Sequence, residues 1–252
     1  MSNRPPRLKI GLGQIPITSG DKRANLAAVV TMVNEAARAR CDVLALPECC
    51  LAGWLAPAAT VAAEPIPGPF IRKLAGLARH HKMAIVAGLE ERLEERLFNS
   101  AVFLDETGKL LLRHRKINEL EVARTTYSTG QSLHVTGWRG RTIGLSICAD
   151  SWRPEVTDAL CLMGANLIFS PCAWAVEPGG EAPNLAWITQ TYRTRVGSRD
   201  LTIIAPNCVG PVTAGPWKGR VLQGNSLVVG PHGAVHATGP TNTPGLIVWD
   251  CP

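Results

Sequence analysis

The sequence has few aromatic and few charged residues, and both shortages exclude classes of function. Only 5% of the 252 residues are aromatic and 18% are charged. A nucleic-acid groove combines clustered Lys and Arg with interleaved aromatics, whereas the basic residues here are scattered apart from the short run at 113–116. The low charge also excludes a disordered polyelectrolyte tail. We therefore expect no nucleic-acid partner, and we interpret the net charge of +6 as a solvated basic surface.

Long apolar runs and paired cysteine motifs are also missing. No stretch of ~18 apolar residues is available to span a bilayer, and the first fifteen residues lack the apolar segment and cleavage site of a signal peptide. The eight cysteines include no CxxC spacing. In a long chain without a secretory signal, such cysteines are expected to be reduced thiols rather than disulfides or zinc ligands. These absences predict a protein without a membrane span and with a cytoplasmic location.

The residues that are present alternate between strand patterns and helix patterns, which predicts an α/β fold. Adjacent strand pairs joined by tight turns, "DETG" at 105–108 and "PHG" at 231–233, indicate that antiparallel pairing is mixed in. Without a repeat or a linker, the sequence predicts a single domain over residues 1–252. Helices are predicted at 21–40, 68–82, 155–165 and 182–200. Strands are predicted at 7–15, 41–48, 83–92, 141–148, 166–174, 201–210, 224–239 and 245–250, and two strands joined by a turn at 97–116.

Three predicted strands end on a reactive side chain. Glu48 ends "LALPE", Lys116 ends "LLLRHRK" and Cys148 ends "GLSIC". Strand ends aim such side chains into a crevice at the edge of a sheet. A thiol with a pKa near ~8.5 is mostly protonated at neutral pH and needs a base or a cation nearby. Glu48 could accept the thiol proton, and Lys116 could stabilise an oxyanion.

Each of these three residues also has a simpler interpretation when taken alone: a solvated loop glutamate, a solvated lysine and an inert core thiol. They lie 68 and 32 residues apart, so only a fold could bring them together. A Cys–His hydrolase with His114 or His134 as the base is an alternative, although no "CGSCW"-like segment surrounds the cysteine. A non-catalytic binding protein is the third interpretation.

Six segments in a fixed order carry a resemblance to a known family. They are "ALPECCLAGW", "RHRKINELE", "IGLSICADSWRPE", "GANLIFSPCAW", "APNCVG" and "GNSLVVGPHGAVHATG". Together they resemble the nitrilase, or carbon–nitrogen hydrolase, superfamily, from "KIGLGQ" to "GLIVWD". The resemblance implies a four-layer αββα sandwich of two mixed β-sheets with outer helices. It also implies hydrolysis of a small amide or carbamoyl compound through a cysteine thioester, without a metal or other cofactor.

The resemblance also implies roles for individual residues. Glu48 would be the general base, Lys116 the electrostatic stabiliser and Cys148 the nucleophile. The backbone N–H of Ala149 would share the oxyanion hole with Lys116. Many family members carry a second glutamate after the lysine, and between Glu119 and Glu121 its usual distance from the lysine favours Glu121.

Two further residues are candidates for contact with the substrate. Trp174 is expected to line the pocket, and Arg153 either braces the turn after the nucleophile or binds a substrate carboxylate. The segment "CADSWRPE" lacks the Trp–Glu pair that directly follows the cysteine in nitrilases, so amides are favoured over nitriles. By resemblance, a homo-oligomer, dimer or larger, is also expected.

Overall fold

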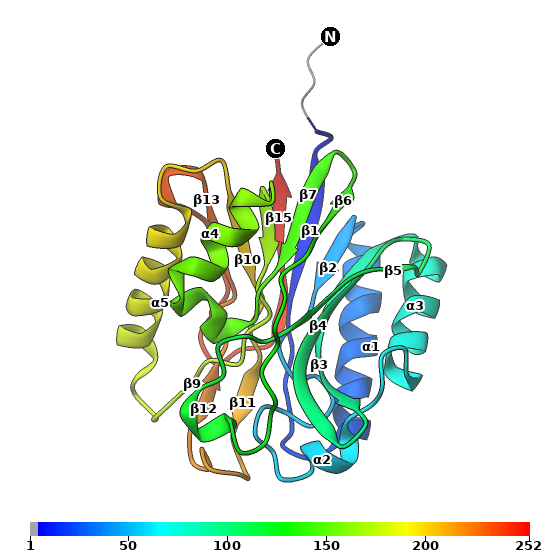
Figure 1. Ribbon diagram of the computed structural model, residues 1–252, viewed down its shortest axis with the longest axis vertical. Coiled ribbons are helices and arrows are strands. Elements are labelled where there is room, and N and C mark those ends of the chain that lie inside the picture. The colour runs from blue at the N-terminus through cyan, green and yellow to red at the C-terminus, as the bar shows by residue number, and fades with distance from the viewer. Residues whose placement is uncertain (1–4) are drawn as a thin grey trace.

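The computed structural model describes residues 5–252 and contains two six-stranded mixed β-sheets (Figure 1). In the first sheet, β1, β2 and β3 are parallel, and β4, β5 and β15 pair antiparallel. Helices α1 (Lys22–Arg38) and α3 (Pro69–His81) lie on its outer face. The strand order is β15 (Gly245–Cys251), β1 (Leu8–Gln14), β2 (Val43–Ala45), β3 (Ala84–Leu93), β4 (Arg96–Leu104) and β5 (Leu110–Arg115).

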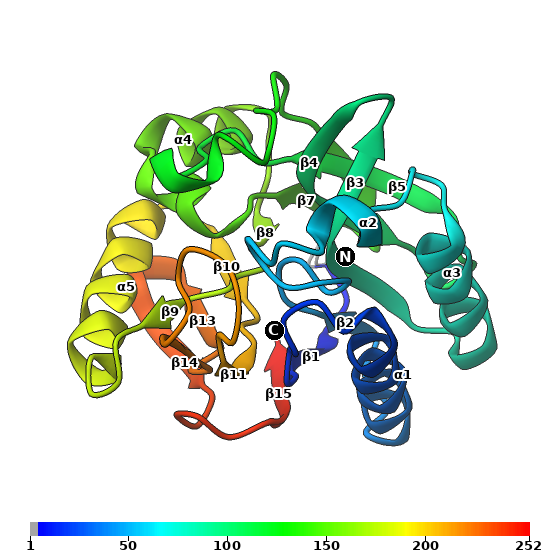
Figure 2. The same ribbon diagram turned by 90° about the horizontal axis from the view of Figure 1, so that it is seen from below.

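The second sheet has the same mixed character. Strands β7, β8 and β10 are parallel, with antiparallel strands at both edges. Helices α4 (Pro154–Leu162) and α5 (Glu181–Val196) cover its outer face, so the layers run helix, sheet, sheet, helix (Figure 2). The strand order is β14 (Ala234–Thr238), β13 (Leu227–Gly230), β10 (Thr202–Ala205), β8 (Leu167–Phe169), β7 (Arg141–Leu145) and β6 (Val135–Trp138).

The alternation of side chains along the strands explains this layering. Leu8, Ile10 and Leu12 of β1 point between the sheets, into one core cluster that contains side chains from both. Gly13, the residue after Leu12, lies on the opposite face of the strand and faces α1, where a Cβ atom would lie 2.6 Å from Cγ of Met32. A glycine here therefore allows the helix to approach the sheet closely. The αββα sandwich predicted from the resemblance is confirmed.

The structure differs from the sequence predictions mainly in short elements. The strand predicted at 141–148 ends at Leu145, and a 3₁₀ turn over Cys148–Trp152 follows. The segment 117–140, predicted as irregular, contains β6 and a 3₁₀ turn at Glu121–Ala123. Elements of two to four residues are too short to show a periodicity. Those missed are α2 (Ala59–Ala62) and a small third sheet of β9 (Ala175–Val176), β11 (Val209–Pro211) and β12 (Val221–Gln223).

Residues 5–252 contain no helix with both the length and the apolar character that crossing a bilayer requires.

Candidate active site

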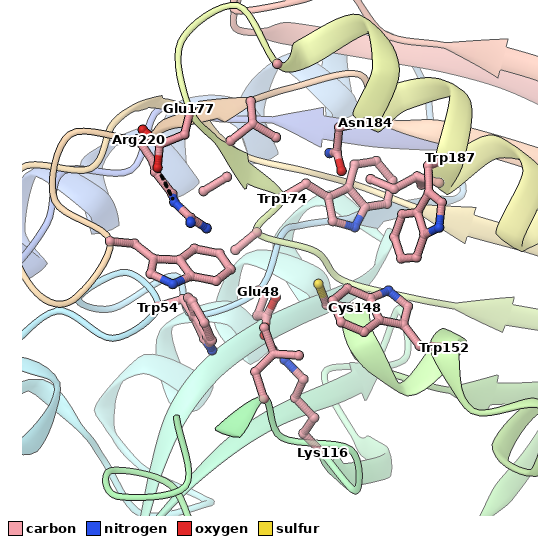
Figure 3. A pocket seen from close by; sticks show the side chains of 17 residues that line it. Glu48, Trp54, Lys116, Cys148, Trp152, Trp174, Glu177, Asn184, Trp187 and Arg220 are labelled. Atoms are coloured by element: carbon pink, nitrogen blue, oxygen red, sulfur yellow. Dashed lines mark hydrogen bonds and ion pairs between the residues drawn. The ribbon is translucent and has the colours of Figure 1, made fainter. Parts of the chain in front are cut away.

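Glu48, Lys116 and Cys148 line a single cavity of about 510 Å³ (Figure 3). Glu48 follows β2 and Lys116 follows β5, both in the first sheet, whereas Cys148 follows β7 of the second. The cavity therefore lies where strand ends of the two sheets meet. The three residues predicted from separate strand ends are brought together, and all three are buried.

Glu48 and Lys116 form a buried ion pair. The Lys116 Nζ donates to Glu48 Oε1 over 2.7 Å, and the Asn99 Nδ2 donates to the same oxygen over 2.6 Å. Burial acts to lower the pKa of Lys116, but the charges of Glu48 and Glu119 raise it well above its ordinary value. Lys116 is therefore a fixed cation at neutral pH. Neither hydrogen bond uses Oε2 of Glu48.

The backbone around Glu48 is held by close packing against β3. The Gly88 N–H donates to the Pro47 carbonyl over 2.9 Å, and the Cys50 N–H donates to the Gly88 carbonyl over 3.0 Å. A Cβ atom on Gly88 would lie 2.6 Å from Cα of Glu48, so only glycine permits this approach. The position of the Glu48 carboxylate is thus fixed by backbone contacts as well as by its side-chain partners.

Cys148 stands on a sharp turn with its backbone in the left-handed region, at φ 46°. Such a conformation is uncommon for a non-glycine residue and is a feature of strained functional turns. The Cys148 N–H donates to the Pro171 carbonyl over 3.0 Å, and the Ser151 hydroxyl donates to the Cys148 carbonyl over 2.7 Å. These bonds hold the turn, while Sγ points into the cavity (Figure 3).

The Cys148 thiol is protonated at rest. The neighbouring Cys172 thiol, burial and the negative charge of Glu48 raise its pKa well above the ordinary value, and Lys116 opposes them. A thiol in this state needs a base within the cavity before it can attack an electrophile. Glu48, which lies on the same cavity wall, is a carboxylate suited to accept that proton.

Asp150 ties the nucleophile turn to the segment after Lys116. Its carboxylate accepts from the backbone N–H groups of Ile117 at 3.0 Å, Asn118 at 2.7 Å and Ile147 at 2.9 Å. His114 Nε2 lies 2.8 Å from the same buried group. Burial acts to raise the pKa of Asp150, but these bonds and the charge of Lys116 lower it. The charged form therefore braces both strand ends.

The two candidates for the second glutamate differ in burial and in their distance from Lys116. Glu119 is buried, with Oε2 at 3.9 Å from the Lys116 Nζ, whereas Glu121 is exposed in the 3₁₀ turn at Glu121–Ala123. The geometry therefore brings Glu119, and not Glu121, next to the lysine. Burial, together with Glu48 and Asp150, raises the pKa of Glu119 to about 8, against the effect of Lys116.

The other predicted residues are placed as follows. Trp174 is buried in the cavity wall and Ala149 is buried directly after the nucleophile. Arg153 is exposed at the start of α4 and is not among the cavity-lining residues, and its backbone N–H donates to the Asp150 carbonyl over 3.1 Å. Within residues 5–252, no cluster of His, Cys, Asp and Glu is arranged to hold a metal ion.

Sequence reasoning missed Asn99 and most of the aromatic lining. Trp54, Trp152, Trp187 and Trp217 line the cavity together with Trp174, so five of the seven tryptophans face it. The composition contains a signal, because tryptophan outnumbers phenylalanine and tyrosine in this chain. No sequence spacing predicts the cluster, because each of the five tryptophans comes from a different segment of the chain.

Comparisons with known proteins agree with this geometry. The profile described as carbon–nitrogen hydrolase matches residues 9–252. An (R)-stereoselective amidase of Pseudomonas sp is 30% identical over 90% of this chain and 79% of its own length. An omega-amidase of Bos taurus is 26% identical, over 92% of this chain and 84% of its own.

Solved structures extend the likeness to three dimensions. An amidase from Nesterenkonia sp. superposes with a TM-score of 0.84 at 26% identity, covering 99% of this chain and 92% of its own. A cysteine-to-alanine mutant of the amidase from Nesterenkonia sp. AN1, in complex with butyramide, has a TM-score of 0.83 at 25% identity and covers 97% and 91%.

Proposed function

Because this chain belongs to the carbon–nitrogen hydrolase family, we propose that it hydrolyses the C–N bond of a small amide or carbamoyl compound to an acid and ammonia or an amine. The observation that carries the proposal is the buried contact of 2.7 Å between Lys116 and Glu48 in the same cavity as the Cys148 thiol. This is an activated-nucleophile arrangement for acyl transfer. The amidases among its relatives support amides as the substrate class.

In the first half of the reaction, Cys148 Sγ attacks the carbonyl carbon while Glu48 takes the thiol proton. The Lys116 ammonium and the Ala149 N–H stabilise the resulting oxyanion, since donors fixed in a buried site stabilise developing charge strongly. Glu48 then gives its proton to the nitrogen as the C–N bond breaks. Ammonia or an amine leaves, and the acyl group remains on Sγ as a thioester.

In the second half, Glu48 takes a proton from a water molecule, which attacks the thioester carbon. The same two donors stabilise the second oxyanion. When the C–S bond breaks, the acid is released and the thiolate regains its proton from Glu48. Because the pKa of Cys148 is raised, this reprotonation is favourable and returns the site to its resting state.

Glu119 takes the role expected for Glu121. Its carboxyl lies next to the Lys116 ammonium, and neither of its oxygens has a hydrogen-bond partner within residues 5–252. With a pKa of about 8 it is mostly protonated at neutral pH, so it adds no full negative charge beside the Lys116 ammonium. We assign Glu119 as a positioning residue that orients the Lys116 ammonium.

The test is ammonia release and intact-mass trapping on matched amides, carbamoyl amino acids and nitriles. Wild type should release ammonia from amides and accumulate an acyl mass on Cys148, whereas Cys148→Ala should do neither. Glu119→Ala should lower kcat while Glu121→Ala should not, because of these two glutamates only Glu119 lies beside Lys116. Faster turnover of nitriles than of amides would contradict the substrate class, and absence of any acyl-enzyme would contradict catalysis.

We also propose that the protein acts in the cytoplasm as a homo-oligomer. All eight cysteines are free thiols, which suits a reducing compartment. Leu162 and Met163, at the end of α4, expose apolar surface that a second copy of the chain could cover. Light scattering coupled to size exclusion tests the assembly, and a monomeric mass at micromolar concentration would contradict it.

A further inference from the structure

The cavity has two aromatic walls on opposite sides of the reactive cysteine. Trp54 and Trp217 form an edge-to-face pair with ring centroids 4.4 Å apart, and Trp152 and Trp187 form a second pair at 5.2 Å. Trp174 lies beside the second pair and completes that wall (Figure 3). Figure 3 shows Cys148 Sγ beside Trp152 and Trp174, with Trp187 beyond them and Glu48 on the other side.

The first wall already carries positive charge. The Lys116 Nζ lies 5.7 Å from the centroid of the Trp54 ring, and the Arg220 guanidinium lies 4.2 Å from that of Trp217. These cations occupy the ring faces that a cationic ligand would use. With both ring faces already taken, this wall is a poor binding site for a cationic group.

Two further polar side chains of the lining, Arg220 and Asn184, are paired with protein partners. Arg220 Nε donates to Glu177 Oε1 over 3.0 Å, and Asn184 Nδ2 donates to Gln223 Oε1 over 2.6 Å. Glu177 adds a negative charge at the mouth of the cavity, which disfavours a substrate carboxylate there. The second wall, formed by Trp152, Trp174 and Trp187, therefore faces a space with no unpaired charge of its own.

From this arrangement we propose that the preferred substrates are neutral primary amides with a flat, aromatic acyl group bound against the wall of Trp152, Trp174 and Trp187. This inference rests on the proposed amide hydrolysis. Glu48 protonates the leaving nitrogen, so the nitrogen departs on the Glu48 side of the carbonyl carbon. The acyl group must then extend away from Glu48, toward the three indoles, where it gains apolar and aromatic contacts.

The experiment compares phenylacetamide with butyramide, both primary amides, on wild type and on three variants. Wild type should have a kcat/KM for phenylacetamide about tenfold or more above that for butyramide. Trp187→Ala should lower kcat/KM for phenylacetamide about three- to tenfold, with a much smaller change for butyramide, and Trp187→Phe should restore most of the loss. Trp249→Ala is the matched control, since Trp249 stacks on His236 outside the cavity.

The outcomes separate this inference from the proposed function. Equal or better turnover of butyramide would overturn the substrate class and leave amide hydrolysis intact. An equal loss for both amides in Trp187→Ala, with a change in oligomeric mass, would assign Trp187 to subunit contact and also overturn it. If neither amide releases ammonia, the proposed hydrolysis is contradicted, and calorimetry of phenylacetamide binding to Cys148→Ala then tests the inference. Binding that Trp187→Ala weakens would support the aromatic acyl site, and absence of binding would overturn it.

Discussion

The buried carboxyl of Glu119 makes the stability of this protein depend on pH in a predictable direction. Its pKa is about 8 in the folded protein and 4.5 in an ordinary glutamate. Between these two values the folded chain holds a proton that the unfolded chain has released. The free energy of unfolding therefore falls as pH rises through this window. The glutamine of Glu119→Gln has a similar shape and cannot ionise, so the substitution removes this contribution.

The size of the effect follows from the same two values. One pKa unit corresponds to about 1.4 kcal/mol. Between pH 5 and pH 8, the free energy of unfolding of Glu119→Gln should therefore rise by about 3 kcal/mol relative to that of wild type. For a chain of this length, the melting temperature of Glu119→Gln should rise by roughly 6–12 °C relative to that of wild type over the same pH range. Glu90, whose pKa is raised by burial to about 7, is present in both proteins and cancels in the difference.

Urea unfolding of wild type, Glu119→Gln and Glu121→Gln at several pH values measures this directly. Glu121 is exposed two residues away and serves as the matched control, for which no pH-dependent gain is expected. A gain for Glu119→Gln that stays constant from pH 5 to pH 8 would refute the reasoning. An equal gain for Glu121→Gln would show that the effect belongs to surface charge rather than to the buried carboxyl.

Three further substitutions test the supports of the site. Cys172→Ala removes the neighbouring thiol that raises the pKa of Cys148, so iodoacetamide should alkylate Cys148 at lower pH than in wild type; an unchanged pH profile would contradict this. Gly88→Ala places a Cβ atom 2.6 Å from Cα of Glu48 and should cost about 1–3 kcal/mol of stability and most of the ammonia-release rate, whereas an active, stable variant would show that the loop adjusts. Asn99→Leu removes a donor to Glu48 at 2.6 Å and should lower kcat about tenfold or more with little change in KM, and a change confined to KM would oppose a role for Asn99 in positioning the base.

Much of the fold could be predicted because its main elements are long and strongly patterned. Helical periodicity over 21–40 and 68–82 matches α1 and α3 within a few residues. The three reactive residues could be proposed because each follows an apolar strand, and strand ends converge in α/β folds. The two-residue strand β9 and the three-residue strand β12 gave no such pattern, because their positions depend on tertiary pairing.

The choice between Glu119 and Glu121 could not be made from sequence for a physical reason. The direction of the chain after Lys116 is fixed by Asp150, which accepts hydrogen bonds from the N–H groups of Ile117 and Asn118 although it lies 33 and 32 residues further along the sequence. This long-range contact turns Glu119 inward and leaves Glu121 in solvent. The tryptophan cavity escaped prediction similarly, because its members meet only through the packing of distant segments.

The Asp150 carboxylate also explains how two separate sheets supply one reaction centre. Glu48 and Lys116 follow strands of the first sheet, while Cys148 follows a strand of the second, so any sliding between the sheets would change their separation. Asp150 bonds to the chain just before Cys148 and just after Lys116 at the same time, through fully buried oxygens. Because burial strengthens these charge-assisted bonds, the brace fixes the oxyanion-stabilising cation relative to the nucleophile. Preorganisation of this kind requires that Lys116 and Cys148 be positioned before the substrate enters. The reactivity of the site therefore depends on how the two sheets are joined, and not on any one residue.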